Sequence, residues 1–200
     1  MVQLKQSLNN SGRSNPPTFS FRRFYDWYVV DKKYINYLTQ FDSHVGYVGY
    51  VEYGERLKLH VGILLTVGDF HYYVPISSAK PKHQKMSNSL DFHKLQDEST
   101  RYLYAVLNIN NMIPVPDSCL TQLKYNQVDN FRSFKNPKEK TDYIYLLQKE
   151  KAMIDNIEKT LQNKALKLYQ KCISKPDSSL ATRCCNFKLL EEKCNLYPHT

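Results

Sequence analysis

Hydrophobic runs in the first 120 residues of the chain predict a set of β-strands. Residues Phe19–Val30 form an aromatic, strand-like segment. The run "KLHVGILLTV" is continuously apolar, as in a buried strand, and Gly68 and Asp69 then turn the chain into "FHYYVPI". These two runs predict a central hairpin. The segments "LDFHKLQ", "YLYAVLNIN" and "MIPVP" predict further short strands, and Pro114 and Pro116 confine the last one to an edge or an exit of the sheet.

Helical spacing of apolar residues appears in three segments. Asp31 is expected to cap a short helix with the sequence "KKYINYLTQFD". From Asn136 to about Ile173 the apolar residues recur with a period of 3.6, which predicts one long amphipathic helix or two helices in series. The segment "CNFKLLEEKC" predicts a last short helix, capped by Asn186.

The length and the order of these segments predict one α+β domain. A chain of 200 residues is long enough for one sizeable core and short for two full domains. Residues 1–18 contain few large apolar side chains and many Asn, Ser and Pro, so we expect a disordered arm there. The folded domain is expected to span residues 19–200.

The charge of the chain points to a polyanionic partner. It has 28 Lys and Arg against 19 Asp and Glu, a formal charge of +9 and a pI near 9.2. Sixteen tyrosines among these cations suit single-stranded nucleic acid, on whose bases aromatic rings stack. The ordinary alternative is that Tyr fills half-buried strand positions and Lys keeps the protein soluble.

The long helical segment carries much of this charge. Between Lys135 and Lys175 there are ten lysines against five acidic residues. This pattern predicts a face that follows RNA phosphates, with Lys164 and Lys167 as candidates. A solvated helical face is the alternative.

Other features bear on compartment and metal content. The five cysteines are odd in number and show no CxxC spacing, which favours reduced thiols and argues against a zinc site. No run approaches the roughly eighteen apolar residues that a membrane span needs, and the N-terminus has no apolar signal region. We therefore expect a cytoplasmic protein that does not bind membranes.

The chemistry available to the chain is limited. It contains no GxxxxGK[ST], GxGxxG, HExxH or GxSxG motif, and its acidic residues do not gather in the pairs that a two-metal nuclease needs. RNA can nevertheless be cut without a metal, because its 2′-hydroxyl can attack the adjacent phosphate. The protein then has only to position that group, move protons and stabilise the extra negative charge.

Hydroxyls and cations occur together after the second strand of the predicted hairpin. Ser77 and Ser78 end that strand, and Lys80 follows two residues later. One hydroxyl is expected to orient the 2′-hydroxyl or the scissile phosphate, and Lys80 to reach the same group. Lys58 begins the preceding strand and approaches the loop only if register and twist allow it. His83, with an ordinary pKa of about 6.5, is the other candidate acid or base.

The proton donor stays open among Lys58, Lys80 and His83. Lysines that crowd one phosphate site repel each other, which lowers the pKa of at least one of them. The ordinary interpretation is that the serine pair forms a turn or a helix cap and that "KPKHQK" is an exposed loop.

Five segments resemble motifs of one protein family, in the right order and with compatible spacing. They are "KKYINYLTQFD", "KLHVGILL", "VPISSAK", "NINNMIPVP" and "CNFKLLEEK", and together they cover about residues 24–197. They are similar to segments of the ToxN/AbiQ family, the endoribonuclease toxins of type III toxin–antitoxin and abortive-infection systems. The third segment resembles a catalytic loop, although Ala79 replaces its usual proline.

The resemblance implies a compact α+β fold, with a strongly twisted antiparallel sheet flanked by helices, as in small-barrel toxins. It implies a ribonuclease without metal or other cofactor that leaves a 2′,3′-cyclic phosphate. Members cut their own repeat antitoxin RNA into pseudoknotted units, which then bind and inhibit them in a closed assembly of toxin and RNA. Target mRNA would be the other partner.

The resemblance also assigns residues. The family's catalytic positions fall on Ser77, Ser78, Lys80, Lys58 and His83.

A family tyrosine before the lysine strand corresponds to Tyr53, with Tyr50 and Tyr47 as alternatives. Together with Lys82 and Lys85 it is expected to bind RNA. Two other functions remain possible from sequence: a basic RNA-binding protein without catalysis, and a protein whose long helix packs on a protein partner.

Overall fold

The structure is a computed structural model that describes residues 19–20, 25–46 and 58–198 of the chain. The predicted arm, residues 1–18, lies outside this part. The described residues include eight strands. Their bounds are β1 Phe19–Ser20, β2 Asp26–Val30, β3 Leu59–Val67, β4 Phe70–Ser78, β5 Phe92–Gln96, β6 Leu103–Asn108, β7 Ile113–Pro114 and β8 Leu120–Gln122.

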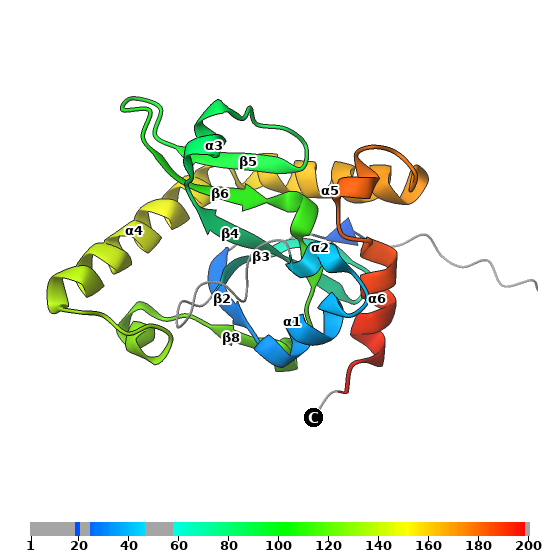
Figure 1. Ribbon diagram of the computed structural model, residues 1–200, viewed down its shortest axis with the longest axis horizontal. Helices are drawn as coiled ribbons and strands as arrows, with labels where there is room; N and C mark the ends of the chain where they lie inside the picture. Colours follow the sequence, from blue (N-terminus) through cyan, green and yellow to red (C-terminus); the bar gives the residue numbers. More distant parts are fainter. Residues whose placement is uncertain (1–18, 21–24, 47–57, 199–200) are drawn as a thin grey trace, which may run out of the picture.

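These strands form one sheet in which every pairing is antiparallel. The main order is β5-β6-β4-β3-β2-β8, while β1 also pairs with β3 and β7 with β4. Helices lie at both ends of this sheet in Figure 1, α4 at one end and α1 and α6 at the other. The predicted α+β fold, an antiparallel sheet flanked by helices with a long C-terminal helical region, is confirmed.

The predicted hairpin of β3 and β4 is the centre of the sheet. All nine residues of β3 are buried, which explains its continuous apolar run. Gly68 turns the chain with a φ of +56°, a conformation that glycine adopts without steric cost. Gly62 lies under the ring of Tyr73, and a Cβ atom added there would be 2.1 Å from Tyr73 Cδ1. The two strands therefore approach as closely as a residue without a side chain permits.

The helices follow most of the sequence expectations. The predicted helix of residues 136–173 is two helices in series, which meet where Ile157 leaves helical geometry with φ −110° and ψ 16°. Asp31 and Asn186 cap their helices as predicted, with side-chain oxygens that accept from Lys33 N at 2.7 Å and from Leu189 N at 3.2 Å. The α-helices are α1 Lys32–Thr39, α2 Ser43–Gly46, α3 Pro81–Lys85, α4 Pro137–Asn156, α5 Glu158–Ser174 and α6 Phe187–Leu196.

Some local expectations were wrong. The segment "KPKHQK" is not a loop, because α3 begins at Pro81, whose fixed φ suits the first position of a helix. The helix predicted for "KKYINYLTQFD" ends at Thr39, so Phe41 follows the helix and is 41% exposed. The strand β8 and the short 3₁₀ helix Tyr125–Asn130 carry no periodic apolar signal and were not predicted.

Several tyrosines belong to the core. Tyr72 and Tyr169 are buried, and both donate their hydroxyls to Glu191 Oε1, at 2.8 and 2.7 Å. Lys188 Nζ lies 2.7 Å from the other carboxylate oxygen. For these rings the structural role is clear: they join β4, α5 and α6 through one buried carboxylate. They are not available to stack on RNA.

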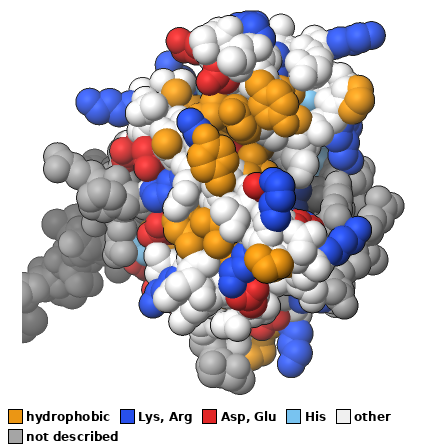
Figure 2. Space-filling model, turned by 90° about the vertical axis from the view of Figure 1, so that its left-hand side faces the viewer, with side chains coloured by type: hydrophobic (Ala, Val, Ile, Leu, Met, Phe, Trp, Pro, Cys, Tyr) orange, Lys and Arg blue, Asp and Glu red, His pale blue; other side chains and the backbone are white. Residues whose placement is uncertain are grey.

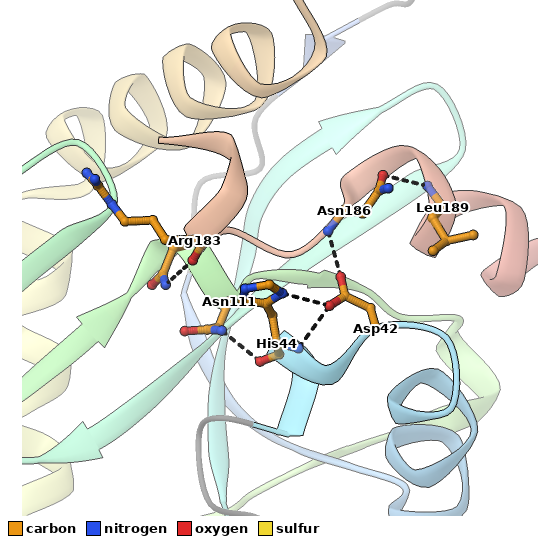
Figure 3. A network of polar contacts seen from close by, with 7 residues as sticks. Asp42, His44, Asn111, Arg183, Asn186 and Leu189 are labelled. Carbon is orange, nitrogen blue, oxygen red and sulfur yellow. Dashed lines mark hydrogen bonds and ion pairs between the residues drawn. The ribbon is translucent and has the colours of Figure 1, made fainter. Parts of the chain in front are cut away.

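A polar network fixes the C-terminal segment to the rest of the fold (Figure 3). Asp42 accepts from the backbone nitrogens of His44 at 2.9 Å and Asn186 at 2.6 Å, so it joins α2 to the start of α6. Asn111 Nδ2 donates to the carbonyl of His44 at 2.8 Å. Because backbone groups from distant segments meet here, the network fixes how α6 is oriented against the sheet.

Two further observations concern the cysteines and the length of the helices. All five cysteines carry free thiols and are buried. In the part of the chain that the structure describes, no helix is both long and apolar enough to cross a membrane.

Candidate active site

Three neighbouring strands bring Lys58, Ser77 and Asn108 together. In the register of the sheet, His60 faces Pro75, which places Lys58 opposite Ser77. Lys58 Nζ donates a hydrogen bond to Ser77 Oγ at 2.6 Å, and Asn108 Nδ2 donates to the same oxygen at 3.0 Å. The hairpin therefore supplies the register and twist that sequence alone left open.

The ammonium group of Lys58 is easier to deprotonate than that of an ordinary lysine. Burial disfavours its charged form, and the positive charge of Lys80 adds to this, so the pKa of Lys58 falls to about 8. Two of the predicted catalytic lysines thus interact electrostatically. A lysine with this pKa can exchange a proton near neutral pH.

Ser78 and Lys80 face solvent next to this cluster. Within the described residues, the hydrogen bonds from Lys58 and Asn108 go to Ser77 and not to Ser78. The Ser78 side chain is exposed and, with Lys58, lines a pocket of about 150 Å³. Lys80 is exposed and extended, with φ −124° and ψ 156°, just before α3. A hydroxyl and a cation at this position can contact a phosphate without losing a contact within the protein.

His83 occupies a different position from the other candidates. It is only 6% exposed, its Nδ1 accepts from the backbone nitrogen of Lys80 at 3.1 Å, and its ring lies 5.8 Å from that of Phe92. Burial, with the charges of Lys82 and Lys80, lowers the pKa of His83. The ring is therefore neutral at pH 7 and fixes the backbone at Lys80. A direct catalytic role for His83 stays a prediction.

The predicted RNA-binding residues are not alike. Lys82 and Lys85 are exposed on α3, directly after the serine loop, and Lys167 is exposed on α5. Lys164 instead points inward, and its Nζ donates to the carbonyl of Phe92 at 3.3 Å and lies 3.0 Å from His93 Nδ1. It joins α5 to β5.

The tyrosine predicted to bind RNA, Tyr53, and its alternatives Tyr47 and Tyr50 lie outside the described residues.

Sequence reasoning did not assign two groups near this site. Asn108 belongs to the "NINNMIPVP" segment, so a signal was present, but no role was given to it. Glu150 of α4 lines the same pocket as Ser78 and Lys58. Glu150 lies among lysines on the helix for which the sequence predicts a phosphate-binding face. The fold shows instead that Glu150 is buried, with 5% of its surface exposed.

The face of the molecule that carries α4 combines apolar and basic groups. Figure 2 shows hydrophobic side chains gathered near its centre, with Lys and Arg side chains around them and several Asp and Glu side chains in between. Such a surface suits unpaired nucleic acid, in which both bases and phosphates are exposed.

Comparison with known proteins identifies the family. The family model described as "Toxin ToxN, type III toxin-antitoxin system" matches residues 26–195. The chain belongs to this ToxN family. The matched region contains the Lys58, Ser77 and Asn108 cluster, the exposed residues Ser78 and Lys80, and the pocket beside α4.

Relatives of this ToxN-family chain include named ribonucleases. Endoribonuclease AbiQ of Lactococcus lactis subsp. lactis is 31% identical over 180 residues, which cover 86% of this chain and 88% of AbiQ. Endoribonuclease ToxN of Bacillus thuringiensis subsp. kurstaki is 28% identical over 176 residues, 86% of this chain and 83% of that protein.

Solved structures of family members share the fold. One comes from work on bacterial type III systems in which a non-coding RNA pseudoknot selectively inhibits the toxin. It matches with a TM-score of 0.72 and 26% identity, over 88% of this chain and 99% of that one. AbiQ, described as a lactococcal anti-phage endoribonuclease, matches with a TM-score of 0.70 and 29% identity, over 87% of this chain and 98% of AbiQ.

Proposed function

We propose that this protein is an endoribonuclease toxin that cuts RNA without a metal ion, through attack of the ribose 2′-hydroxyl on the adjacent phosphate. The products are a 2′,3′-cyclic phosphate and a 5′-hydroxyl. The observation that supports this most is the grouping of Lys58, Ser77 and Ser78 at the end of one hairpin, with the charge of Lys80 close enough to lower the pKa of Lys58. Hydroxyls and cations are the groups that this reaction requires.

The geometry suggests a role for each side chain. Ser78 faces the open pocket and donates to the phosphate or the 2′-hydroxyl. The 2′-hydroxyl passes its proton to solvent water as its oxygen bonds to phosphorus. Lys58 and Lys80 stabilise the negative charge that grows on the phosphorane, and Lys58, with a pKa of about 8, supplies a proton to the 5′-oxygen as the bond between phosphorus and that oxygen breaks. Ser77 and Asn108 hold Lys58 in place.

The relatives suggest the biological setting. AbiQ and ToxN are endoribonucleases of type III toxin–antitoxin systems, and a pseudoknotted RNA inhibits one of the matched toxins. We therefore propose that this protein processes its own repeat antitoxin RNA, assembles with the resulting pseudoknots into an oligomer, and cuts mRNA in the cytoplasm during phage abortive infection.

The test compares wild-type protein with Ser78→Ala on a long single-stranded transcript, in buffer with excess EDTA. We expect wild-type cleavage to persist with chelator and the variant to lose at least about a hundredfold in rate, as when one transition-state hydrogen bond is removed. RNA binding, measured by filter retention, should change little.

The control is Ser174→Ala, an exposed serine at the end of α5. Chelator-sensitive cleavage would contradict the metal-free mechanism. Unchanged cleavage by Ser78→Ala would contradict the site. Binding without cleavage by the wild-type protein would favour a non-catalytic RNA-binding protein.

A further inference from the structure

The pocket beside Ser78 extends away from the reacting groups toward α4. Lys58 and Ser78 line it from the sheet, and Tyr143, Leu147 and Glu150 line it from α4. Leu59 and Ile76 add apolar wall, and Arg132 adds a further polar group. None of the proposed catalytic roles uses the α4 side of this pocket.

Glu150 is an unusual residue for such a place. Only 5% of its surface is exposed. Within the described part of the chain, its carboxyl group has no hydrogen-bond partner in the protein. Burial raises the pKa of Glu150 to about 7. The Glu150 oxygens are not among the fully inaccessible unpaired atoms of the described residues, so they reach the pocket. Their remaining hydrogen bonds must come from water or from a ligand in the pocket, which makes Glu150 a candidate to recognise a polar group there.

Glu150 does not act as the counter-ion of Lys58. An ion pair would raise the pKa of the lysine and lower that of the carboxyl group. Both pKa values instead move toward neutrality, to about 8 for Lys58 and about 7 for Glu150. Lys58, on the sheet side of the pocket, is therefore free to face a phosphate, and Glu150, on the α4 side, is free to face an uncharged polar group.

We infer that this pocket receives one unpaired nucleobase of the RNA, next to the scissile phosphate, and that the carboxyl group of Glu150 reads the Watson–Crick edge of that base. The inference rests on the proposed ribonuclease function and adds to it the residue that selects the cleavage site.

The size and the walls of the pocket fit a base. Its volume is about 150 Å³, and an engineered apolar cavity of about 150 Å³ in another protein holds benzene. The ring of Tyr143 forms a rigid wall, because the Arg132 guanidinium lies 4.5 Å above its centroid and is itself held by Glu139 Oε1 at 2.7 Å. Unstacked bases of single-stranded RNA bind in such places, between aromatic faces and edge-reading polar groups.

The protonation state of Glu150 predicts which bases fit. A neutral carboxyl group offers one donor and one acceptor side by side. Adenine and cytosine present the complement, an amino donor next to a ring-nitrogen acceptor. A carboxylate offers acceptors only, which would suit guanine. Since burial and the neighbouring RNA phosphate both favour the neutral form, we expect adenine or cytosine in the pocket.

The first test maps cleavage sites of the full-length protein on a pool of RNA with random sequence. Wild-type protein should prefer adenine or cytosine at one position beside the cut. Glu150→Leu should reduce that preference by roughly ten- to a hundredfold, the discrimination of one bidentate pair, and change no other position. Glu150→Gln keeps a donor next to an acceptor and should keep the preference.

The matched control is Glu192→Gln on α6, an exposed carboxylate at the opposite end of the molecule in Figure 1. A Glu150→Leu profile identical to that of the wild type would overturn the inference. So would an equal loss of rate for all bases in both Glu150 variants, which would make Glu150 a proton-transfer group.

A second test does not depend on cleavage. Nucleoside 3′-monophosphates are titrated into wild-type protein and into Glu150→Leu, and the methyl NMR signals of Leu146 and Leu147, which line the pocket, are followed. Adenosine or cytidine monophosphate should shift them saturably in the wild type, with at least tenfold weaker binding in the variant. If no nucleotide shifts them, the inference fails even where cleavage by the wild type supports the proposed function. If they shift but no RNA is cut, only the proposed function fails.

Discussion

The Lys58 ammonium donates a hydrogen bond to the Ser77 hydroxyl at 2.6 Å, across the central hairpin of the sheet. Asn108 donates to the same oxygen, so both acceptor sites of Ser77 are used. The side chain of the adjacent Ser78 is exposed and lines the pocket together with Lys58. The two serines therefore have different roles: Ser77 positions Lys58, and Ser78 is available to the RNA.

Cleavage should fall as the pH rises through about 8. The pKa of Lys58 is lowered to about 8, so below this value the group is an ammonium that can donate a proton, and above it the proton is lost. The measurement is kcat/KM between pH 6 and 10, which reports the free enzyme. Lys58→Arg, whose side chain stays charged, should remove this alkaline decrease, although its different shape lowers the rate.

The same profile tests the contact between the two lysines. Since the charge of Lys80 helps to lower the pKa of Lys58, Lys80→Met should move the alkaline decrease to higher pH as well as slow the reaction. Lys159→Arg, an exposed lysine on α5, serves as the control and should leave the profile unchanged. An alkaline decrease that persists in Lys58→Arg would show that another group donates the proton.

Much of this site could be predicted from sequence because its groups lie at the ends of strongly patterned strands. The continuous apolar run of β3 and the Gly68 turn define the hairpin, and a hairpin with a short turn places the start of one strand beside the end of the next. Lys58 and Ser77 meet for this reason.

Other parts of the site depend on contacts that sequence does not encode locally. Glu150 looks like a surface residue in a helix rich in lysine, and its burial follows only from where α4 packs against β5 and β6. Lys164 was expected on an RNA-binding face for the same reason. Its inward direction results from the carbonyl of Phe92 and the ring of His93, which lie 72 and 71 residues away along the chain.

Lys164 and Lys167 on the same helix should respond differently to substitution. Lys167→Ala should weaken RNA binding and lower the slope of log K against log salt by about 1, if this residue contacts one phosphate. Lys164→Met should instead lower the free energy of unfolding by about 1 kcal/mol, through its lost hydrogen bonds to β5. Binding at several salt concentrations and urea unfolding measure the two effects. Equal salt slopes for both variants would contradict this division.

The close approach of β3 and β4 should make Gly62 intolerant of any side chain. An alanine Cβ would lie 2.1 Å from Tyr73 Cδ1 and 2.9 Å from its Cγ, so the buried ring has to move. Gly62→Ala should therefore lower the free energy of unfolding by roughly 1–3 kcal/mol, the usual cost of overpacking a core. Urea unfolding measures this change.

Gly68→Asn is the matched control, because no atom lies within 4 Å of its Cβ position and Asn tolerates a positive φ. A Gly62→Ala protein as stable as Gly68→Asn would show that the ring shifts at no cost.

Glu150 should make the stability of the protein depend on pH. Its pKa is raised by burial from 4.5 in the unfolded chain to about 7 in the fold, so the folded state favours the neutral form. The contribution of Glu150 to the free energy of unfolding is fully present below pH 4.5, falls as the pH rises toward 7, and is lost above pH 7. The shift corresponds to about 3 kcal/mol at 1.36 kcal/mol per pKa unit.

Glu150→Gln cannot ionise and lacks this dependence, so the comparison isolates one group. We expect the wild type to lose about 2.5 kcal/mol of unfolding free energy relative to Glu150→Gln between pH 5 and pH 8, and almost nothing further above pH 8. Urea unfolding at pH 5, 6, 7 and 8 gives the difference, and subtraction removes the contributions of buried histidines such as His60, which titrate in both proteins. Glu192→Gln, exposed on α6, should run parallel to the wild type. If the unfolding free energy of Glu150→Gln also changes with pH in parallel with that of the wild type, the Glu150 carboxyl group is hydrated in solution. The pocket then has no unmet hydrogen bond with which to select a base.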